Sequence, residues 1–315
     1  MPKAAIQNAA YTDENKAREA LEAVRWPNGP VCPHCGNLDQ EKIAKGEGKA
    51  HRLGLYYCAA CNGQFTVTVG TVMERSKIPL SKWLLAMHLM ASSKKGMSAH
   101  QLHRMLGITY KSAWFMAHRI REAMIERKRG PMGGHGKVVQ ADETYYGNTS
   151  KRAKSYRKGN RYKQQVVALV EPGARVRAFH VKSATKDGVR DILVSNVDRK
   201  SELHTDESPL YVQVGREFAA HKTVKHGSNK SGFVAASYVG PDGQHTNNVE
   251  NFFGVFKRGM RGTYHFCGEQ HLARYVAEFE FRYNNRSGLG IEDGERMAIA
   301  LKGIEGKRLT YRPTH

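Results

Sequence analysis

The spacing of apolar residues predicts a long amphipathic helix late in the chain. Within residues 243–262, apolar side chains recur at the i, i+3, i+4 and i+7 positions of one buried helical face, and these are Val249, Phe252, Phe253 and Phe256. Glu250 and Lys257 lie seven residues apart, on one stripe and about 10 Å from each other. This separation is too long for a simple i,i+4 ion pair and suits a metal ion beside a phosphate. An amphipathic helix with two solvated charges would give the same pattern.

Helical spacing also dominates the first half of the chain. A short helix is predicted after Thr12, and longer ones from Pro79, over about 98–106 and over about 111–126. Gly107 separates the last two helices, and such a short glycine-containing turn is typical of a DNA-binding helix-turn-helix. An ordinary three-helix packing unit is the alternative. On the last helix, the polar residues expected to face outward are Lys111, Ser112, His118, Arg119 and Arg121.

The second half of the chain predicts a mixed sheet with flanking helices. Strands are expected at about 138–146, 165–170, 174–181 and 202–206, and an earlier one at 65–72. Besides the helix within 243–262, helices are expected at about 187–197, 212–225 and 270–283. The glycine-rich basic segment 127–137 is the clearest domain boundary. Together these patterns predict a multi-domain α/β protein.

Four of the five cysteines form two CxxC pairs, Cys32 with Cys35 and Cys58 with Cys61. A glycine close behind each pair allows a tight turn in which backbone N–H groups face the sulfur atoms. Four thiolates complete a tetrahedral zinc site with no open position, so we predict a structural zinc ribbon. Four unrelated buried cysteines would require both spacings to be accidental. Paired cysteines of this kind also indicate a metal site in a reducing compartment.

The chain carries 50 Lys and Arg residues against 29 Asp and Glu, a formal net charge of +21. Because this excess is spread along the chain, nucleic acid is the expected partner. A membrane surface is the alternative, but no apolar run approaches a membrane-spanning length and the N-terminus lacks a signal-peptide core, so we expect a cytoplasmic protein. The basic segment 151–163 suits phosphate contacts, although a solvated hairpin tip would look the same. The candidate DNA contacts are Lys111, Arg119, Lys151, Arg152, Lys154, Arg157, Lys158, Lys257, Arg258 and Arg261.

Three carboxylates on separate predicted elements could meet at one end of the sheet, and these are Asp142, Asp206 and Glu250. An Asp inside an apolar strand is unfavourable unless it is paired or binds a cation. Asp142 and its neighbour Glu143 should point to opposite faces of their strand, so only one of them can enter a given site. Carboxylates suit Mg²⁺ or Mn²⁺, and two such ions about 4 Å apart could support phosphoryl transfer on DNA.

Three motifs resemble the DDE-class insertion-sequence transposases, in particular the ISXO2-like group. They are Ala141-Asp-Glu-Thr-Tyr-Tyr-Gly147, His204-Thr-Asp206 and the run from His245 to His265. The resemblance implies an N-terminal zinc ribbon and helix-turn-helix, followed by an RNase H-like catalytic domain. It also implies a set of metal ligands with an accompanying lysine, namely Asp142, Asp206, Glu250 and Lys257. Asn247 and Asn248 are the alternatives to Glu250 as the third ligand.

The resemblance predicts a transposase that binds insertion-sequence ends in double-stranded DNA, cleaves DNA strands and transfers them. We expect it to act as a homodimer or higher oligomer, associated with the nucleoid of a bacterial-type cell. The alternative is a zinc-ribbon DNA-binding regulator with an inactive transposase-derived domain. The expected regions are a helix and zinc ribbon at 13–72, a helix-turn-helix at 73–127, the RNase H-like domain at 138–286 and a basic C-terminal tail at 287–315.

Overall fold

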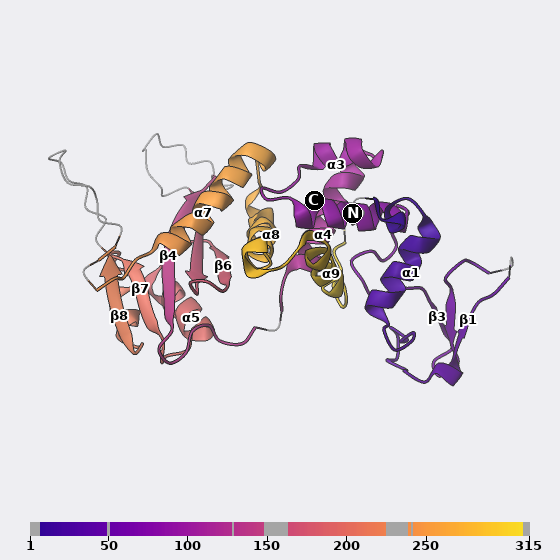
Figure 1. Ribbon diagram of the computed structural model, residues 1–315, viewed down its shortest axis with the longest axis horizontal. Coiled ribbons are helices and arrows are strands. Elements are labelled where there is room, and N and C mark those ends of the chain that lie inside the picture. The colour runs from indigo at the N-terminus through magenta and orange to yellow at the C-terminus, as the bar shows by residue number, and fades with distance from the viewer. Residues whose placement is uncertain are drawn as a thin grey trace. The chain divides into compact units, whose positions relative to one another are not determined.

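The computed structural model describes residues 7–48, 51–127, 129–147, 163–224, 239–240 and 242–310. The chain forms two compact units (Figure 1). Unit 1 combines Met1–Ile125 with Gly290–His315, and unit 2 is Glu126–Leu289. The division falls beside the glycine-rich basic segment that the sequence marks as a boundary.

Unit 1 contains a small antiparallel sheet that confirms the predicted zinc ribbon. Its strands are β1 (Ile43–Lys45), β2 (Tyr56–Cys58) and β3 (Gly63–Phe65), in that order. Tyr56 and Phe65 are cross-strand partners whose rings stack at 5.6 Å, and Trp26 packs edge-on against both. This aromatic cluster is the core of a ribbon too small to bury much other apolar surface.

The strand predicted at 65–72 was wrong beyond Phe65. Residues after it form successive turns, in which Val69 N donates to Thr66 O and Thr71 N donates to Thr68 O. The Arg25 guanidinium donates to Val67 O at 2.7 Å. The sequence alternates between apolar and polar residues here because the turns direct the side chains of Val67 and Val72 into the interior.

Four helices of unit 1 begin and end close to the predicted positions, and these are α1 (Glu14–Arg25), α2 (Leu80–Ser92), α3 (Ala99–Leu106) and α4 (Tyr110–Met124). A further helix, α9 (Asp293–Lys302), was not predicted. Ser98 caps the start of α3 by accepting from Gln101 N. Gly107 ends α3 at a φ of 58°, a left-handed conformation that glycine adopts without strain. α4 then begins after Thr109, whose hydroxyl accepts from Ser112 N.

The expectation of a basic C-terminal tail at 287–315 was wrong, because much of this segment is folded. Helix α9 buries Met297, Ala300 and Leu301. Farther on, the Lys307 side chain is buried and its ammonium group donates to the carbonyl oxygens of Ala123 and Ile125. A cation there satisfies carbonyls that the end of α4 leaves without helical partners. One of the positive charges that suggested a tail, that of Lys307, therefore caps the C-terminal end of α4.

Unit 2 is built on a five-stranded sheet in the order β6-β5-β4-β7-β8. The strands are β4 (Val138–Tyr146), β5 (Gln164–Val170), β6 (Val176–Val181), β7 (Glu202–Asp206) and β8 (Ala220–Val224). The first three are antiparallel neighbours, whereas β7 and β8 run parallel to β4. This topology confirms the expected RNase H-like mixed sheet.

The helix predicted at 212–225 was wrong over most of its length. Only a short helix, α6 (Val212–Gly215), forms there, and the chain then returns as strand β8. The turn depends on Gly215, because a Cβ at that position would lie 2.0 Å from the ring of His221. The backbone groups of β8 pair with β7, which stabilises a strand at a sequence that local spacing reads as helical.

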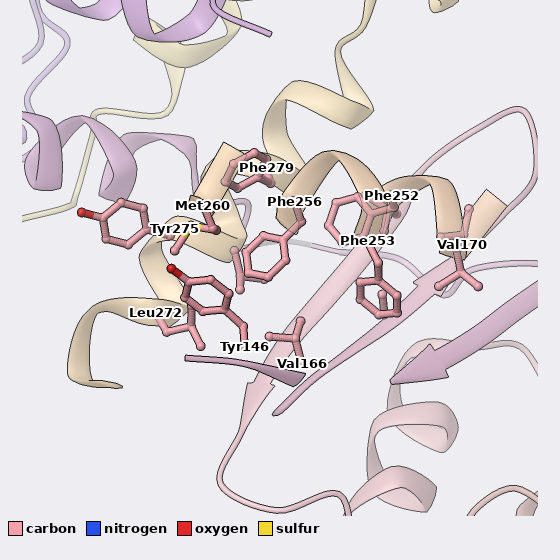
Figure 2. Packing of buried hydrophobic residues seen from close by; sticks show 14 of the residues in the cluster. Tyr146, Val166, Val170, Phe252, Phe253, Phe256, Met260, Leu272, Tyr275 and Phe279 are labelled. Carbon is pink, nitrogen blue, oxygen red and sulfur yellow. The ribbon is translucent and has the colours of Figure 1, made fainter. Parts of the chain in front are cut away.

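Helices cover both faces of this sheet. On one face lie α7 (Asn247–Gly259) and α8 (Leu272–Asn284), and Figure 2 shows Phe253 and Phe256 of α7 directed at the strands. On the other face the apolar cluster includes residues of α5 (Lys186–Asn196) and α6. β5 is buried on both faces, since Val166 belongs to the first cluster and Val167 to the second.

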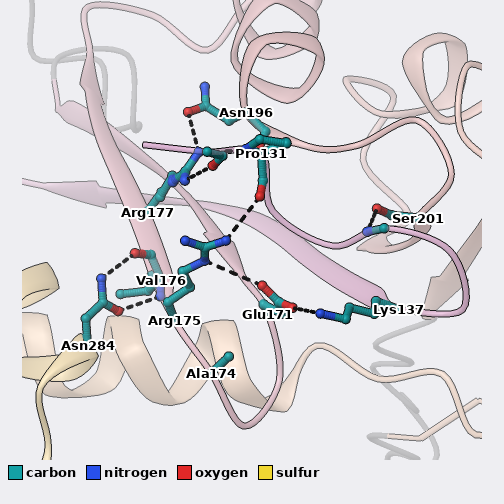
Figure 3. Close-up of polar contacts among 12 residues, drawn as sticks. Pro131, Lys137, Glu171, Ala174, Arg175, Val176, Arg177, Asn196, Ser201 and Asn284 are labelled. Atoms are coloured by element: carbon teal, nitrogen blue, oxygen red, sulfur yellow. Dashed lines mark hydrogen bonds and ion pairs between the residues drawn. The ribbon is translucent and has the colours of Figure 1, made fainter. Parts of the chain in front are cut away.

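Polar contacts hold the chain where it enters this sheet (Figure 3). The Arg175 guanidinium donates to Pro131 O at 3.1 Å, and Arg177 donates to Gly130 O and to the Asn196 side chain. Asn284 of α8 bonds both backbone groups of Val176, at 2.7 and 2.9 Å. These bonds fix β6 against both the entering segment and α8.

Candidate catalytic site and zinc site

The four paired cysteines converge in unit 1. Cys32 and Cys61 have their sulfur atoms 3.6 Å apart, and those of Cys35 and Cys58 are 3.8 Å apart. Zinc–sulfur bonds of about 2.3 Å in a tetrahedron place sulfur atoms roughly 3.8 Å from one another. All four sulfur atoms lie within 4.8 Å of one another, so the set fits a zinc ion.

The backbone around these cysteines is shaped for thiolates. The residue after each pair has a left-handed conformation, with φ of 76° at Gly36 and 55° at Asn62. Desolvation raises the pKa of the Cys58 thiol, but hydrogen bonds with the backbone N–H groups of Cys61 and Ala60 and with the thiols of Cys35 and Cys32 together lower the pKa to about 7. The His34 ring hydrogen-bonds to Gln64 O at 3.1 Å and lies outside the four-sulfur set.

Carboxylates converge in unit 2 where strands β4 and β7 separate. The two parallel strands are paired from Val138 with Glu202 to Gln140 with His204. Two residues farther along stand Asp142 and Asp206, which the same register would place side by side on one face. Their carboxylate oxygens and that of Glu143 lie within 4.8 Å of one another. We call Asp142, Glu143 and Asp206 the carboxylate cluster.

The presence of Glu143 corrects the prediction that it faces away from Asp142. Alternation along β4 does hold, because Glu143 accepts a 2.7 Å hydrogen bond from Tyr211, which is buried on the opposite face of the sheet. Beyond Gln140, however, β4 no longer pairs with β7, and the longer Glu143 side chain reaches the gap where the two strands separate. Both faces of the strand therefore contribute to one site.

Burial and mutual repulsion make the cluster electrostatically unfavourable without a cation. Desolvation, followed by the charges of Asp206 and Glu143, raises the pKa of Asp142 to about 8. Desolvation also raises the pKa of Glu143, against the lowering effect of the Tyr211 hydrogen bond. Clustered oxygen ligands with this much unbalanced charge fit a hard divalent cation such as Mg²⁺ or Mn²⁺.

A buried glutamine joins helix α7 to the strand that carries Asp142. The Gln140 side-chain oxygen accepts from Asn248 N at 3.1 Å and Val249 N at 3.3 Å, and its nitrogen bonds to the His245 ring at 3.0 Å. Gln140 thus does for the first turn of α7 what a helix-capping side chain normally does. The contact brings the helix that bears Glu250 beside the strand that bears Asp142.

Glu250 and Lys257 lie near the cluster but outside its closest set of oxygens. The Glu250 carboxylate accepts from Thr246 Oγ1 at 2.8 Å, and its charge is among the causes of the raised pKa of Asp142. Desolvation and then Arg261 lower the pKa of the half-buried Lys257, whereas the charge of Asp142 opposes this. Both side chains therefore share the electrostatic environment of Asp142.

Comparison with known families identifies the chain. Residues 133–284 match the family model for the ISXO2-like transposase domain, and residues 12–64 match the model for the transposase zinc-ribbon domain. The chain belongs to the ISXO2-like transposase family. It is also similar to an uncharacterized protein in transposable element ISH50 of Halobacterium salinarum, with 25% identity over 287 residues that cover 86% of this chain and 91% of that protein.

Solved structures with some likeness to the chain include a viral integrase and a transposase. The catalytic core domain of BIV integrase is 17% identical, with a TM-score of 0.28 over 52% of this chain and 93% of that one. A pre-cleavage Mos1 transpososome gives 12% identity and a TM-score of 0.22, over 62% and 74%. With scores this low, the assignment to the transposase family rests on the sequence matches.

Apart from the half-buried Lys257 described above, the predicted DNA contacts of this transposase-family chain fall into three groups. Lys111 is exposed on the first turn of α4, and Arg258 and Arg261 are exposed at and beyond the end of α7. The outward orientation expected of Arg119 was wrong: it is 6% exposed, it donates to Glu74 O, and its guanidinium lies 5.6 Å from the Trp83 ring centre. Outside the described residues lie Lys151, Arg152, Lys154, Arg157 and Lys158.

His118 and Arg121 are also buried, so the outward face expected for α4 is confined to its first turn. This helix packs on several sides within unit 1, and its later polar residues serve the interior. No helix in the described part of the chain has both the length and the apolar character needed to cross a membrane.

Sequence reasoning missed Gln140 and Tyr211, which hold the site together. Gln140 stands two residues before Asp142 on the same face of β4 and is fully buried. A polar residue at a buried strand position was the signal that could have revealed it, as it did for Asp142. Tyr211 offered no such signal, because its role depends on strand β8 and the short α6, which the sequence pattern does not show.

Proposed function

We propose that this protein is a DDE-class transposase that binds insertion-sequence ends and cleaves and transfers DNA strands at the carboxylate cluster. The observation that carries the proposal is the meeting of Asp142 and Asp206 just beyond the point where the parallel strands β4 and β7 cease to pair, with the pKa of Asp142 raised to about 8 by burial and neighbouring acids. Such strained acids are typical of sites that work with bound metal. The transposase-family matches give this site a reaction class.

Asp142, Asp206 and Glu250 would hold divalent cations, and Glu143, whose carboxylate lies within 4.8 Å of those of Asp142 and Asp206, would share the site. Bound cations would polarise the phosphate and lower the pKa of an attacking water. The charge of Asp142 acts on the Lys257 ammonium group. This ammonium group would contact a phosphate oxygen of the strand to be cut. Its partial burial favours a fixed position for that contact over a mobile one.

Unit 1 would supply recognition of the element ends. The exposed residues of α3 and of the first turn of α4 include Gln101, Arg104, Tyr110 and Lys111. In helix-turn-helix proteins, the N-terminal residues of the second helix contact base edges in the major groove. We expect these residues to read sequence, and the zinc ribbon to add phosphate contacts. The active form would be a homodimer or higher oligomer on double-stranded DNA.

The test is strand nicking of a plasmid that carries the element ends, with Mg²⁺ or Mn²⁺ added back to metal-free protein. The wild-type chain should nick only with the divalent ion, and Asp142→Asn and Asp206→Asn should bind the ends but not nick them. Glu207→Gln is the matched control, because Glu207 adjoins Asp206 but is exposed and lies outside the carboxylate cluster. End binding without any nicking by wild type would favour the regulator alternative instead.

A further inference from the structure

Phe266 is the most exposed large apolar side chain in the described part of the chain, at 83%. It follows α7 and the single π-helical turn that extends this helix over Met260–Tyr264. Exposure of an isolated apolar residue is common on protein surfaces and has no meaning alone. Here the surrounding backbone shows how the exposure is maintained.

The backbone beside Phe266 is strained. Phe266 N donates to Tyr264 O at 2.6 Å, two residues back, and His265 between them has φ 58° and ψ −52°. This is the γ-turn with positive φ, which is rare and unfavourable for a residue other than glycine. Strain of this kind persists only where the surrounding structure fixes it, and it is often found at functional sites.

Both sides of the turn are anchored in the interior of unit 2. The Tyr264 hydroxyl donates to Glu278 at 2.6 Å, and its ring packs edge-on against Tyr275 at 4.7 Å. On the other side, Cys267 is buried in the cluster between α7, α8 and the sheet. Because Tyr264 and Cys267 are fixed inward on the two sides of the turn, Phe266 is directed into solvent by the fold itself.

Cationic side chains connect this turn to the carboxylate cluster. Lys257 and Arg261 are one helical turn apart and close enough that Arg261 lowers the pKa of Lys257. The negative charge of Asp142 has the opposite effect and raises the pKa of Lys257. Arg261 also acts on Tyr146, which shares the buried cluster with Cys267. A polyanion that follows α7 from the cluster would meet the exposed side chains of Arg258 and Arg261 before it reaches the turn.

We propose that Phe266 is a stacking site for an unpaired nucleobase of the DNA strand near the cut, an inference that rests on the proposed function. A flat aromatic ring held in solvent beyond the helix that carries Lys257 and Arg258 matches the chemistry of single-stranded DNA, in which bases stack on rings and phosphates bind cations. A lone aromatic side chain is too small for a stable protein interface. Inserted apolar side chains also stabilise unstacked steps in duplex DNA.

The test compares two DNA ligands of equal length that carry an element end. One is fully paired, and the other has a few unpaired bases at the end to be cut. Phe266→Ala and Phe266→Leu should weaken binding of the partly unpaired DNA by at least about five-fold, the low end for losing one base stack. Binding of the paired DNA should change less than two-fold, on the order of measurement error, because phosphate contacts dominate it.

Phe266→Trp supplies a direct readout, since an aromatic ring is retained. It should keep wild-type affinity, and its added fluorescence should be quenched by the partly unpaired DNA and not by the paired DNA. Val212→Ala is the matched control, because Val212 is an exposed apolar residue of the same unit at 47%. It should leave the affinity for both ligands unchanged.

The outcomes separate this inference from the proposed function. If wild type binds both ligands and Phe266→Ala binds each of them as tightly as wild type does, the stacking site is refuted and the transposase proposal stands. If wild type binds neither ligand, the proposed function fails and the stacking site with it. A change in oligomeric state of Phe266→Ala without a change in DNA affinity would assign the ring to a contact between copies of the chain, which also overturns the inference.

Discussion

The zinc site and the carboxylate cluster are both sets of clustered ligands, but they are assembled in opposite ways. The four cysteines come from two short knuckles, each of which fixes its own geometry through a left-handed residue, Gly36 or Asn62. The acids come from strands that are adjacent only because the whole sheet forms, and Glu250 comes from a helix held by Gln140. A cysteine knuckle can thus be predicted from the spacing of residues along the chain, whereas the carboxylate cluster can be predicted only once the order of the strands in the sheet is known.

The two sites also differ in how they balance charge. At the zinc site, hydrogen bonds from backbone N–H groups lower the pKa of Cys58, whereas the Cys35 thiol and burial raise that of Cys61. In the cluster, burial and neighbouring acids oppose the charged form of Asp142. A structural site benefits from holding its ion permanently, while a site for phosphoryl transfer must bind ions together with a phosphate. The difference leads to predictions of unequal size.

The largest effect is expected at the zinc site. Cys35→Ser or Cys61→Ser should lose one equivalent of zinc and unfold the ribbon, because the binding free energy of a structural zinc ion, about 10–16 kcal/mol in small zinc domains, is also folding free energy. Zinc content by elemental analysis and proteolysis of residues 31–65 measure this. Cys267→Ser is the control and should keep its zinc. Wild-type protein that holds no zinc, with variants that melt like it, would exclude the ribbon as a metal site.

The next effect concerns which acid completes the cluster. Glu250→Gln should lower nicking by at least about 10²–10³-fold, the loss expected for one strong electrostatic contact in a transition state. Glu143→Gln should cost less, about 10–100-fold, because Glu143 is already engaged by the Tyr211 hydroxyl and would act mainly on its neighbours. Glu207→Gln should retain full activity. A dead Glu143→Gln beside an active Glu250→Gln would make Glu143 the third ligand.

These expectations show what the sequence could and could not predict. Cysteine spacing predicted the ribbon, and helix spacing predicted α7, since both depend on residues close in the chain. The inward reach of Glu143 could not be predicted, because it depends on where β4 and β7 cease to pair. Strand β8 was missed because its neighbour β7 stabilises it. The burial of Arg119 was missed because a guanidinium can bury its charge by bonding a carbonyl such as Glu74 O.

A smaller effect follows from the raised pKa of Asp142 in metal-free protein. A carboxyl whose pKa is higher in the folded state stabilises the fold only while protonated, so its contribution is lost as the pH rises from about 4, its ordinary pKa, to about 8. The loss is about 1.4 kcal/mol per pH unit in that window. Asp142→Asn should therefore raise the melting temperature of metal-free protein by several degrees at pH 8 and by little at pH 5.

Added Mg²⁺ provides the check on that prediction. The ion should stabilise wild type at pH 8 and leave Asp142→Asn nearly unchanged, because the variant has lost both the repulsion and a ligand. Thermal unfolding at pH 5 and pH 8, with and without Mg²⁺, measures all four conditions. An equal gain from Asp142→Asn at both pH values would mean that the carboxyl is not strained by its neighbours.

The smallest effect is expected at Gln140, which we infer to be a positioning residue. Gln140→Leu keeps the volume but removes the acceptor for Asn248 N and Val249 N, and a buried donor left without a partner costs about 1–3 kcal/mol. The melting temperature of unit 2 should fall by a few degrees. The matched control is Gln213→Leu, since Gln213 is exposed on α6. If Gln140 positions α7, its variant should also need more Mg²⁺ for half-maximal nicking, because Glu250 is held less well beside Asp142. A stability loss with an unchanged Mg²⁺ requirement would limit Gln140 to a structural role.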